Sequence, residues 1–140
     1  MTETPPITRL LIIDDSKIEQ KLYRLIVERT GLVGEVISFY YAEEALDYLS
    51  SDPRPEVDCI ALDINMPRMT GFEFLDAATE RLGADFVKLV VVMLTTSLDP
   101  EDRRRASRHA VVREFFNKPL SRGHLERMIE LLNPESENVG

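Results

Sequence analysis

Three runs of consecutive apolar residues stand out along the chain, at residues 10–13 (LLII), 59–62 (CIAL) and 89–94 (LVVVML). No polar residue alternates with the apolar ones in these runs. Strands that helices cover on both faces have this pattern, whereas strands with one face in water alternate. We therefore predict a buried parallel sheet. Two weaker candidate strands lie at residues 36–40 and 113–116.

The segments between these runs carry apolar residues at helical spacing, which predicts amphipathic helices with one face on the core. The first helix ends before Gly31, a residue type that often follows the last turn. Pro53 stops the second helix and Gly83 the third. The three apolar stripes consist of Ile18, Leu22, Leu25 and Ile26, then Ala42, Ala45, Leu46 and Leu49, then Phe72, Leu75, Ala78 and Leu82.

Capping residues indicate two more helices. Asp99 stands before Pro100 and two acidic residues, which is a typical helix start, although the continuation is short and polar. Ser121 is placed to cap the last helix, whose apolar face consists of Leu125, Met128, Ile129 and Leu132.

We expect residues 1–6 and 134–140 to be flexible ends of the chain.

Five strand-then-helix units in this order predict an α/β fold. The sheet should be doubly wound, parallel and five-stranded, flanked by five helices and connected by right-handed crossovers. A length of 140 residues suits a single domain, with its core at about residues 7–133. We therefore expect the chain to have no output module of its own and to act through partner proteins.

Composition and charge exclude several classes of function. The chain has 17 basic and 25 acidic residues, a net charge of -8, so we expect no nucleic-acid partner. Cys59 is the only cysteine and lies in an apolar run, which favours burial over redox chemistry. The chain starts without the features of a signal peptide, and residues 89–94 are far shorter than the ~20 residues that span a membrane. We expect a cytoplasmic protein without a membrane partner.

Polar residues follow four of the predicted strands, at the point where each strand ends. They are Asp14 and Asp15, Asp63, Thr95, and Lys118. Because ligands bind at the carboxyl ends of such strands, we expect these side chains to meet. Three carboxylates repel one another, and Mg²⁺ is a cation suited to oxygen ligands. With a lysine and a hydroxyl added, the group predicts a site for a phosphoryl group held on a carboxylate.

Each of these residues also has an ordinary structural explanation. The first two acids could cap a helix, Asp63 could belong to the turn before Pro67, the lysine could be solvated, and the threonine could bond to a nearby backbone group. Together these explanations require four coincidences at four strand ends. The functional interpretation is therefore favoured.

Four sequence motifs follow one another along the chain: residues 11–16 (LIIDDS), 62–71 (LDINMPRMTG), 94–95 (LT) and 116–120 (FNKPL). In this order they resemble the response-regulator receiver domain, of the chemotaxis-protein type. The resemblance covers about residues 7–133 and implies a flavodoxin-like sheet with strand order 2-1-3-4-5. It also implies Mg²⁺ as the cofactor, and a sensor histidine kinase or a histidine phosphotransfer protein as the phosphodonor.

The resemblance implies a role for each acidic residue. Asp63 matches the phosphoacceptor, which becomes 4-aspartylphosphate. Asp15 matches the acid that binds Mg²⁺ directly, and Asp14 the acid that usually acts through metal-bound water. Asn65 stands where the family contributes a backbone carbonyl to the metal.

The remaining matches concern the phosphoryl group and the response to it. Lys118 matches the lysine that pairs with the phosphoryl oxygens, aimed by an expected cis peptide bond before Pro119. Thr95 matches the hydroxyl that binds the phosphoryl group, and Phe115 the aromatic residue that swings inward with it. An alternative is that Phe115 belongs only to the core.

A run of arginines, Arg103–Arg105 with Arg108 and Arg113 nearby, contrasts with the acidic total. It falls on the face of the fourth helix, fifth strand and fifth helix that receivers commonly use for partners or dimers. One interpretation is a docking or homodimer surface. The other is a solvated helix whose charge Glu101 and Asp102 balance.

The leading functional prediction is a single-domain response regulator, a protein that assists its own modification and is not an enzyme with a separate substrate. It would signal to a downstream protein by contact. A phosphate sink or phosphorelay intermediate is an alternative within this class. A small phosphatase of the haloacid-dehalogenase type is a further alternative, but that family has its nucleophile after the first strand, in an Asp-x-Asp pattern. A purely structural receiver-like module is disfavoured by the presence of Asp63, Thr95 and Lys118.

Overall fold

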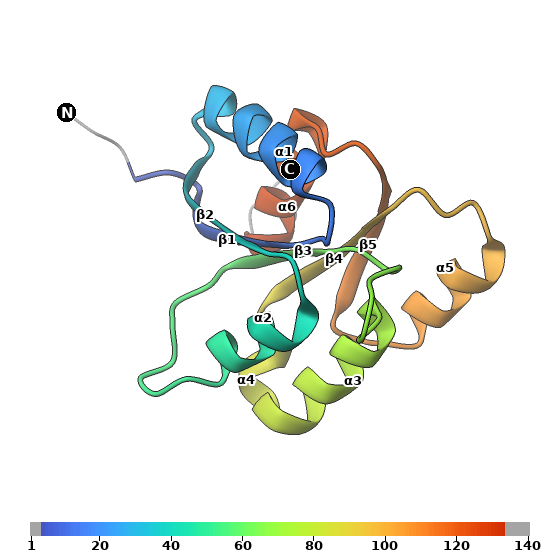
Figure 1. Cartoon of the computed structure of the whole chain (residues 1–140). Coiled ribbons are helices and arrows are strands. Elements are labelled where there is room, and N and C mark those ends of the chain that lie inside the picture. The colour runs from blue at the N-terminus through green and yellow to red at the C-terminus, as the bar shows by residue number, and fades with distance from the viewer. Residues whose placement is uncertain (1–3, 134–140) are drawn as a thin grey trace.

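The structure is a computed structural model that describes residues 4–133. Five parallel strands form one sheet in the order β2-β1-β3-β4-β5 (Figure 1). This order confirms the predicted doubly wound, flavodoxin-like fold. The strands are β1 (Ile7–Ile13), β2 (Val33–Phe39), β3 (Cys59–Leu62), β4 (Val90–Thr95) and β5 (Val112–Asn117). Of the ends expected to be flexible, residues 1–3 and 134–140 lie outside the described residues.

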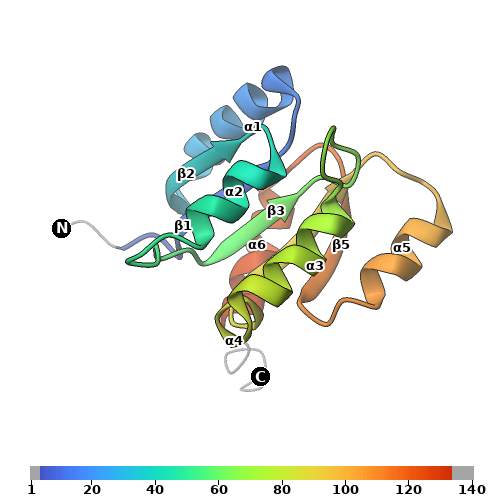
Figure 2. The ribbon, with the colours of Figure 1, turned by 60° about the horizontal axis from the view of Figure 1, so that its bottom comes forward.

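Helices cover both faces of the sheet (Figure 2). The two on one face are α1 (Lys17–Thr30) and α6 (Arg122–Leu132), and the longer two on the other are α2 (Ala42–Leu49) and α3 (Gly71–Leu82). The short helix α5 (Pro100–Ser107) stands beside β5 at the edge of the sheet. This arrangement buries the central strands on both sides, as their apolar runs predicted.

The core has two parts, one on each face of the sheet. Successive residues of β1 point to opposite faces, so Leu11 and Ile13 pack with α2 and α3, while Leu10 and Ile12 pack with α1 and α6. Cys59 is fully buried on the second side. Burial raises the pKa of its thiol to about 12, which fits a residue that serves as a small apolar side chain.

The described residues contain six helices where five were expected. The additional one is α4 (Ala84–Val87), a single turn between α3 and β4. Gly83 has a positive φ of 57° and separates the two helices. Phe86 anchors the turn, since it is buried and its ring packs edge-on against Phe74 at 6.2 Å. So short an element leaves no periodic pattern in the sequence.

The prediction for the face of α1 was wrong. Ile18, Leu22 and Leu25 are 82%, 45% and 45% exposed, whereas the helix buries Gln20, Tyr23 and Val27. The buried set includes a polar residue, so the apolar pattern alone pointed to another face.

The burial of Gln20 has a structural cause. Its side-chain amide Nε2 donates to the carbonyl oxygens of Ile12 at 2.9 Å, Asp14 at 3.1 Å and Phe39 at 3.1 Å. These carbonyls lie at the ends of β1 and β2 and just beyond, so one side-chain amide contacts both strand ends. The side chain of Gln20 therefore holds α1 against the two strand ends.

The predicted helix caps are present. The Ser121 hydroxyl accepts a hydrogen bond from the backbone N–H of His124, and Asp99 caps α5 ahead of Pro100. Gly31 ends α1 in the left-handed conformation with φ of 69°, which is the reason for glycine at this position. Among residues 4–133, none of the helices combines the length and the hydropathy that a membrane span requires.

Candidate functional site

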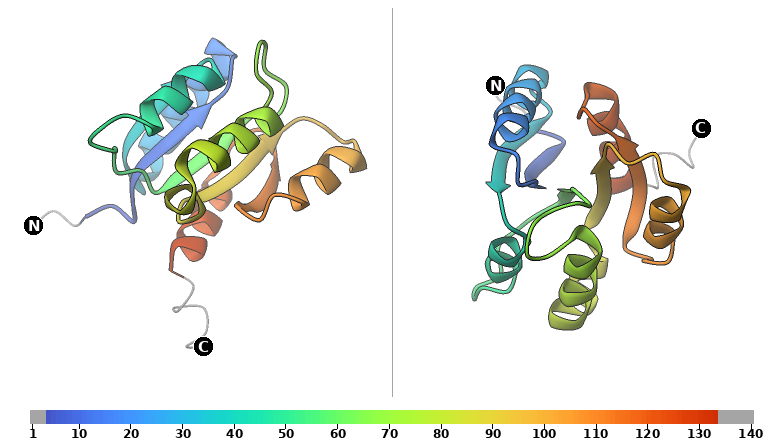
Figure 3. Two further views of the ribbon diagram at one scale, coloured as in Figure 1. Left: turned by 90° about the horizontal axis from the view of Figure 1, so that it is seen from below. Right: turned by 45° about the vertical axis from the view of Figure 1, so that its right-hand side comes forward.

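The strands run side by side toward one end of the sheet, and the loops that follow them meet there (Figure 3). Asp14 follows β1, Asp63 follows β3, Thr95 is the last residue of β4, and Lys118 follows β5. The structure therefore brings the side chains of Asp14, Asp63 and Lys118 together and places Thr95 at the same edge of the sheet. The parallel topology is the physical reason, because it points every carboxyl end the same way.

Three carboxylates form the acidic part of the site. Asp14, Asp15 and Asp63 each offer an oxygen, and these oxygens all lie within 4.8 Å of one another. Asp14 and Asp63 are buried, whereas Asp15 is exposed. The donors are hard oxygens in a compact group that is open on one side, so these residues fit Mg²⁺ with part of its water shell retained.

Burial and neighbouring charges disfavour the ionised form of Asp63. Burial raises the pKa of its carboxyl group to about 6, with the charges of Asp14 and Asp15 adding to the increase and Lys118 opposing it. A carboxylate that is costly to ionise gains from any cation that enters the site. This cost is a second reason for the fit of a divalent metal.

Lys118 supplies the positive charge of the site. Its Nζ lies 2.8 Å from Oδ2 of Asp14, 2.6 Å from Oε2 of Glu19 and 3.4 Å from Oδ1 of Asp63. Burial alone would lower the pKa of this ammonium, but the hydrogen bonds to Asp14 and Glu19 raise it above its ordinary value. Lys118 therefore remains protonated and can donate to an anion.

The backbone around Lys118 and Thr95 is held in place. The N–H of Lys118 donates to the carbonyl of Thr95 at 2.8 Å, and the bond between Lys118 and Pro119 is cis, as expected. The Thr95 hydroxyl is buried and accepts a hydrogen bond from the N–H of Ser97 at 3.0 Å. Both functional groups thus sit at the junction of β4 and β5.

The loop after Asp63 is packed closely against the start of α3. A Cβ atom built on Gly71 would lie 2.4 Å from the backbone oxygen of Asp63, so no larger residue fits without moving that backbone. The N–H of Gly71 donates to the carbonyl of Ile64 at 2.8 Å. Asn65 is exposed in this loop, two positions beyond Asp63.

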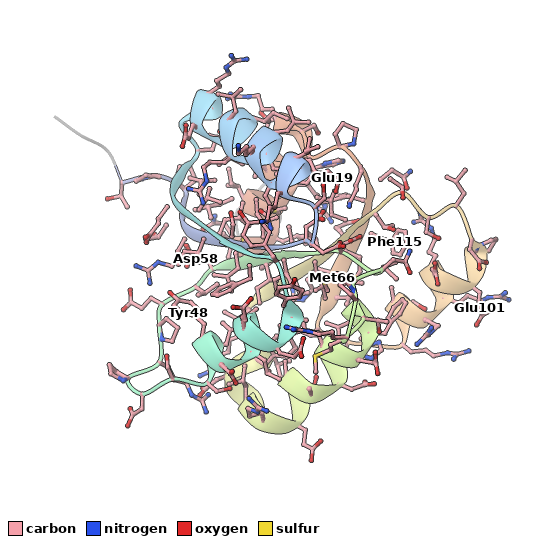
Figure 4. The ribbon with its side chains drawn as sticks, viewed as in Figure 1. Glu19, Tyr48, Asp58, Met66, Glu101 and Phe115 are labelled. Carbon is pink, nitrogen blue, oxygen red and sulfur yellow. The ribbon has the colours of Figure 1, made fainter. Side chains whose placement is uncertain are left out.

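Glu19 is the site residue that the sequence analysis missed. It lies in the first turn of α1, at the end of the helix nearest the loops (Figure 4). Its backbone N–H bonds to the hydroxyl of the capping residue Ser16 at 3.2 Å. The available signal was an acid one helical turn beyond Asp15, but acids are common in the first turn of any helix.

Phe115 and the arginine run form a neighbouring surface. Phe115 is partly buried on β5, with the guanidinium of Arg103 4.6 Å from the centre of its ring. Arg104 pairs with Glu101 at 2.8 Å, and Arg105 lies over the ring of Phe72 at 4.2 Å. The three consecutive arginines therefore have three different partners, and only part of their charge is balanced by acids.

A family model for the response regulator receiver domain matches residues 10–130. The probable methanogenesis regulatory protein FilR2 of Methanothrix harundinacea is 34% identical over 86% of this chain and 78% of its own length. The two-component response regulator ORR1 of rice is 26% identical, and the match spans 87% of this chain but 54% of that protein. A two-component response regulator from Cytophaga hutchinsonii has a similar structure, with a TM-score of 0.82, 28% identity, and coverage of 90% and 96% of the two chains.

Proposed function

The chain belongs to the response-regulator receiver domain family, and we propose that it works as a signalling switch that carries a phosphoryl group on Asp63. The observation that supports this most strongly is the meeting of Asp63 with Lys118, Thr95 and two further acids at one edge of the sheet. An aspartate beside a protonated lysine and a buried hydroxyl suits the binding of a phosphoryl group.

The proposed reaction is an in-line transfer. A carboxylate oxygen of Asp63 attacks the phosphorus of a phosphohistidine, an oxygen–phosphorus bond forms, and the nitrogen–phosphorus bond breaks. The imidazole ring, protonated on its second nitrogen, leaves as the neutral base. Lys118 donates to the phosphoryl oxygens, and the hydroxyl of Thr95 provides a second donor.

Asp14, Asp15, Asp63 and the backbone carbonyl of Asn65 would hold Mg²⁺. Bound there, the ion would neutralise charge on the phosphoryl oxygens. The chain's own residues provide the nucleophile and the fixed donors. The protein therefore assists its own phosphorylation and dephosphorylation, and it needs no separate catalytic site.

The proposed output is a change of surface that a partner protein reads. Phosphorylation adds about two negative charges and new acceptor oxygens beside Thr95, and Phe115 is the aromatic residue proposed to move with it. Receiver domains exchange phosphoryl groups with histidine kinases or histidine phosphotransfer proteins, and we propose such a donor, in the cytoplasm, for this chain. The downstream target is a protein bound by contact.

Labelling with a small phosphodonor tests the proposal directly. Acetyl phosphate with Mg²⁺ should add one phosphoryl group, seen as a shift in intact mass that is lost when EDTA is present. Asp63→Asn should abolish the shift, because the amide is not a nucleophile. Labelling of Asp63→Asn to the level of the wild type would contradict the assignment.

A second experiment separates the output regulator from the phosphate sink. Phosphotransfer profiling against the histidine kinases of the source organism, with Asp63→Ala as control, identifies the donor. Rapid return of the phosphoryl group to that donor supports a sink or relay. Stable binding of a third protein only to the phosphorylated form supports an output regulator. Turnover of phosphate esters with Mg²⁺ would instead support the phosphatase alternative.

A further inference from the structure

The ammonium of Lys118 has three carboxylate neighbours, and one of them, Glu19, has no part in the proposed transfer to Asp63. Of its three carboxylate neighbours, Glu19 is the closest, at 2.6 Å, and Asp63 the farthest, at 3.4 Å. The side chain of Lys118 is 9% exposed, so these contacts are only weakly screened by water. In the unphosphorylated protein, Lys118 is thus bound more closely to Glu19 and Asp14 than to Asp63.

Glu19 is able to release the lysine, unlike the other close acceptor. Asp14 is almost fully buried, and its second oxygen accepts a hydrogen bond from the N–H of Ser16 at 2.9 Å. The carboxylate of Glu19 is 33% exposed and stands on a longer side chain. It can therefore turn toward water without any change in the backbone of α1.

The charge of Glu19 nevertheless stays near the site, because its backbone is fixed by the cap at Ser16. A phosphoryl group on Asp63 brings a further charge of about −1.5 to −2 into a region that already holds Asp14 and Asp15. The phosphorylated state therefore loses the bond between Glu19 and Lys118 and gains a repulsion. The unphosphorylated state has neither cost.

We propose that Glu19 is a positioning residue that competes with the phosphoryl group for Lys118 and thereby sets the phosphotransfer equilibrium toward the donor. The inference rests on the proposed function of Asp63. In the reverse transfer, a neutral imidazole nitrogen attacks the phosphorus, the bond to the Asp63 oxygen breaks, and the carboxylate is regenerated. Lys118 then returns to Glu19.

The equilibrium can be measured with the small pair N-phosphoimidazole and imidazole. At an Mg²⁺ concentration that saturates each variant, the ratio of the two compounds is varied. The phosphorylated fraction is read from the intact mass, and thermal unfolding checks that each variant is folded. Glu19→Gln keeps the size and removes the charge. With Glu19→Gln, the ratio of N-phosphoimidazole to imidazole that phosphorylates half of the protein should be about three- to tenfold lower than with the wild type. This is the change expected for the loss of one charge-assisted hydrogen bond at a half-buried site.

Two further variants separate this role from a general charge effect. Glu28→Gln removes the same charge from an exposed position on the same helix and should leave the ratio unchanged. Glu19→Asp keeps a charge at the site and should restore most of the wild-type ratio. A Glu19→Gln ratio equal to that of the wild type, or an equal shift in Glu28→Gln, would overturn the inference while Asp63 remained the acceptor. No phosphorylation of the wild type by either small donor would overturn the proposed function, and this inference with it.

Discussion

The carboxyl group of Asp63 is buried among other negative charges, which costs free energy in the folded protein. Asp63 is 7% exposed, and the pKa of its carboxyl group is raised from 3.8 to about 6, with burial as the largest cause. Between these two pH values the folded state holds a proton that the unfolded chain releases. The free energy of unfolding therefore falls as the pH rises from about 4 to about 6, and the loss persists at pH 7.

Asp63→Asn should accordingly stabilise the metal-free protein at pH 7, by on the order of 2 kcal/mol in the free energy of unfolding. Near pH 4 the advantage should be much smaller, because Asp63 is then neutral in the folded state and only about half ionised in the unfolded chain. Urea unfolding in EDTA at the two pH values measures the difference. Asp47→Asn, at an exposed position on α2, is the control and should change stability by less than about 0.5 kcal/mol. An Asp63→Asn protein less stable than the wild type at pH 7 would show that the carboxylate stabilises the fold.

Residues at strand ends were predictable from sequence because the fold dictates their position. Asp63 directly follows an apolar run and Lys118 directly follows the end of β5, and parallel strands bring such positions together. Glu19 and Gln20 were missed for a different reason. Both act from the first turn of a helix on partners in other segments, and the contact between Glu19 and Lys118 joins residues 99 positions apart. Composition and spacing within one helix do not reveal such a contact.

At the scale of elements, helix α1 has an exposed apolar surface next to the site. Its apolar residues Ile18, Leu22 and Leu25 face water, and Ile18 directly precedes Glu19 of the site. Under the proposed function, a protein that delivers a phosphoryl group to Asp63 must approach the end of the sheet where Asp63 and Glu19 lie. The exposed apolar residues of α1 therefore offer contact area to a protein donor. A small phosphodonor would not need these contacts.

Leu22→Ser should reduce kcat/KM for transfer from the protein donor by roughly tenfold, a loss typical of a contact residue near the centre of an interface. The rate with acetyl phosphate should not change, since the site itself is intact. Stopped-flow or quenched transfer assays with the donor identified by profiling provide the measurement. Val87→Ser is the matched control, because Val87 is a similarly exposed apolar residue on α4, before β4. Equal effects of the two substitutions, or a loss with acetyl phosphate as well, would argue against contact through α1.

The strands were predicted well where they are apolar throughout, and less well where they begin. β1 starts at Ile7, three residues before the expected start, and continues through Thr8 and Arg9. These polar residues are tolerated because the carboxylate of Asp58 accepts hydrogen bonds from both backbone N–H groups, at 2.6 Å and 3.3 Å. Asp58 lies about 50 positions away in the chain, so the sequence pattern near residue 8 does not predict this contact.

For the molecule as a whole, the net charge of -8 hides an uneven surface. A cavity of about 510 Å³ lies between α5 and β5, lined in part by Arg103, Arg104 and Phe115. Leu98, at its edge, is 87% exposed. Ser97 also lines the cavity, and its backbone N–H donates to the hydroxyl of Thr95, so this surface connects directly to the proposed phosphorylation site.

We expect the face formed by α5, β5 and α6, which includes this cavity, to be the homodimer contact of the phosphorylated protein. Sedimentation velocity with acetyl phosphate and Mg²⁺ should show more dimer than without them. Arg103→Glu should remove the increase, because it reverses the charge beside Phe115. Arg81→Glu, on the opposite side of the sheet from α6, on α3, should retain it. A phosphorylated wild type that stays monomeric would contradict this prediction and leave the arginines as a solvated helix face.

The contact between Lys118 and Asp14 joins residues 104 positions apart, and it has a consequence for the chain during its synthesis. A nascent chain acquires its first acids early, but the ammonium that offsets them leaves the ribosome only after β5 has been made. Until then the acidic loops lack their partner, and Asp63 lacks the donor that would hold a phosphoryl group. Under the proposed function, the capacity to be phosphorylated is thus gained late, after β5 has been made and has folded into the sheet.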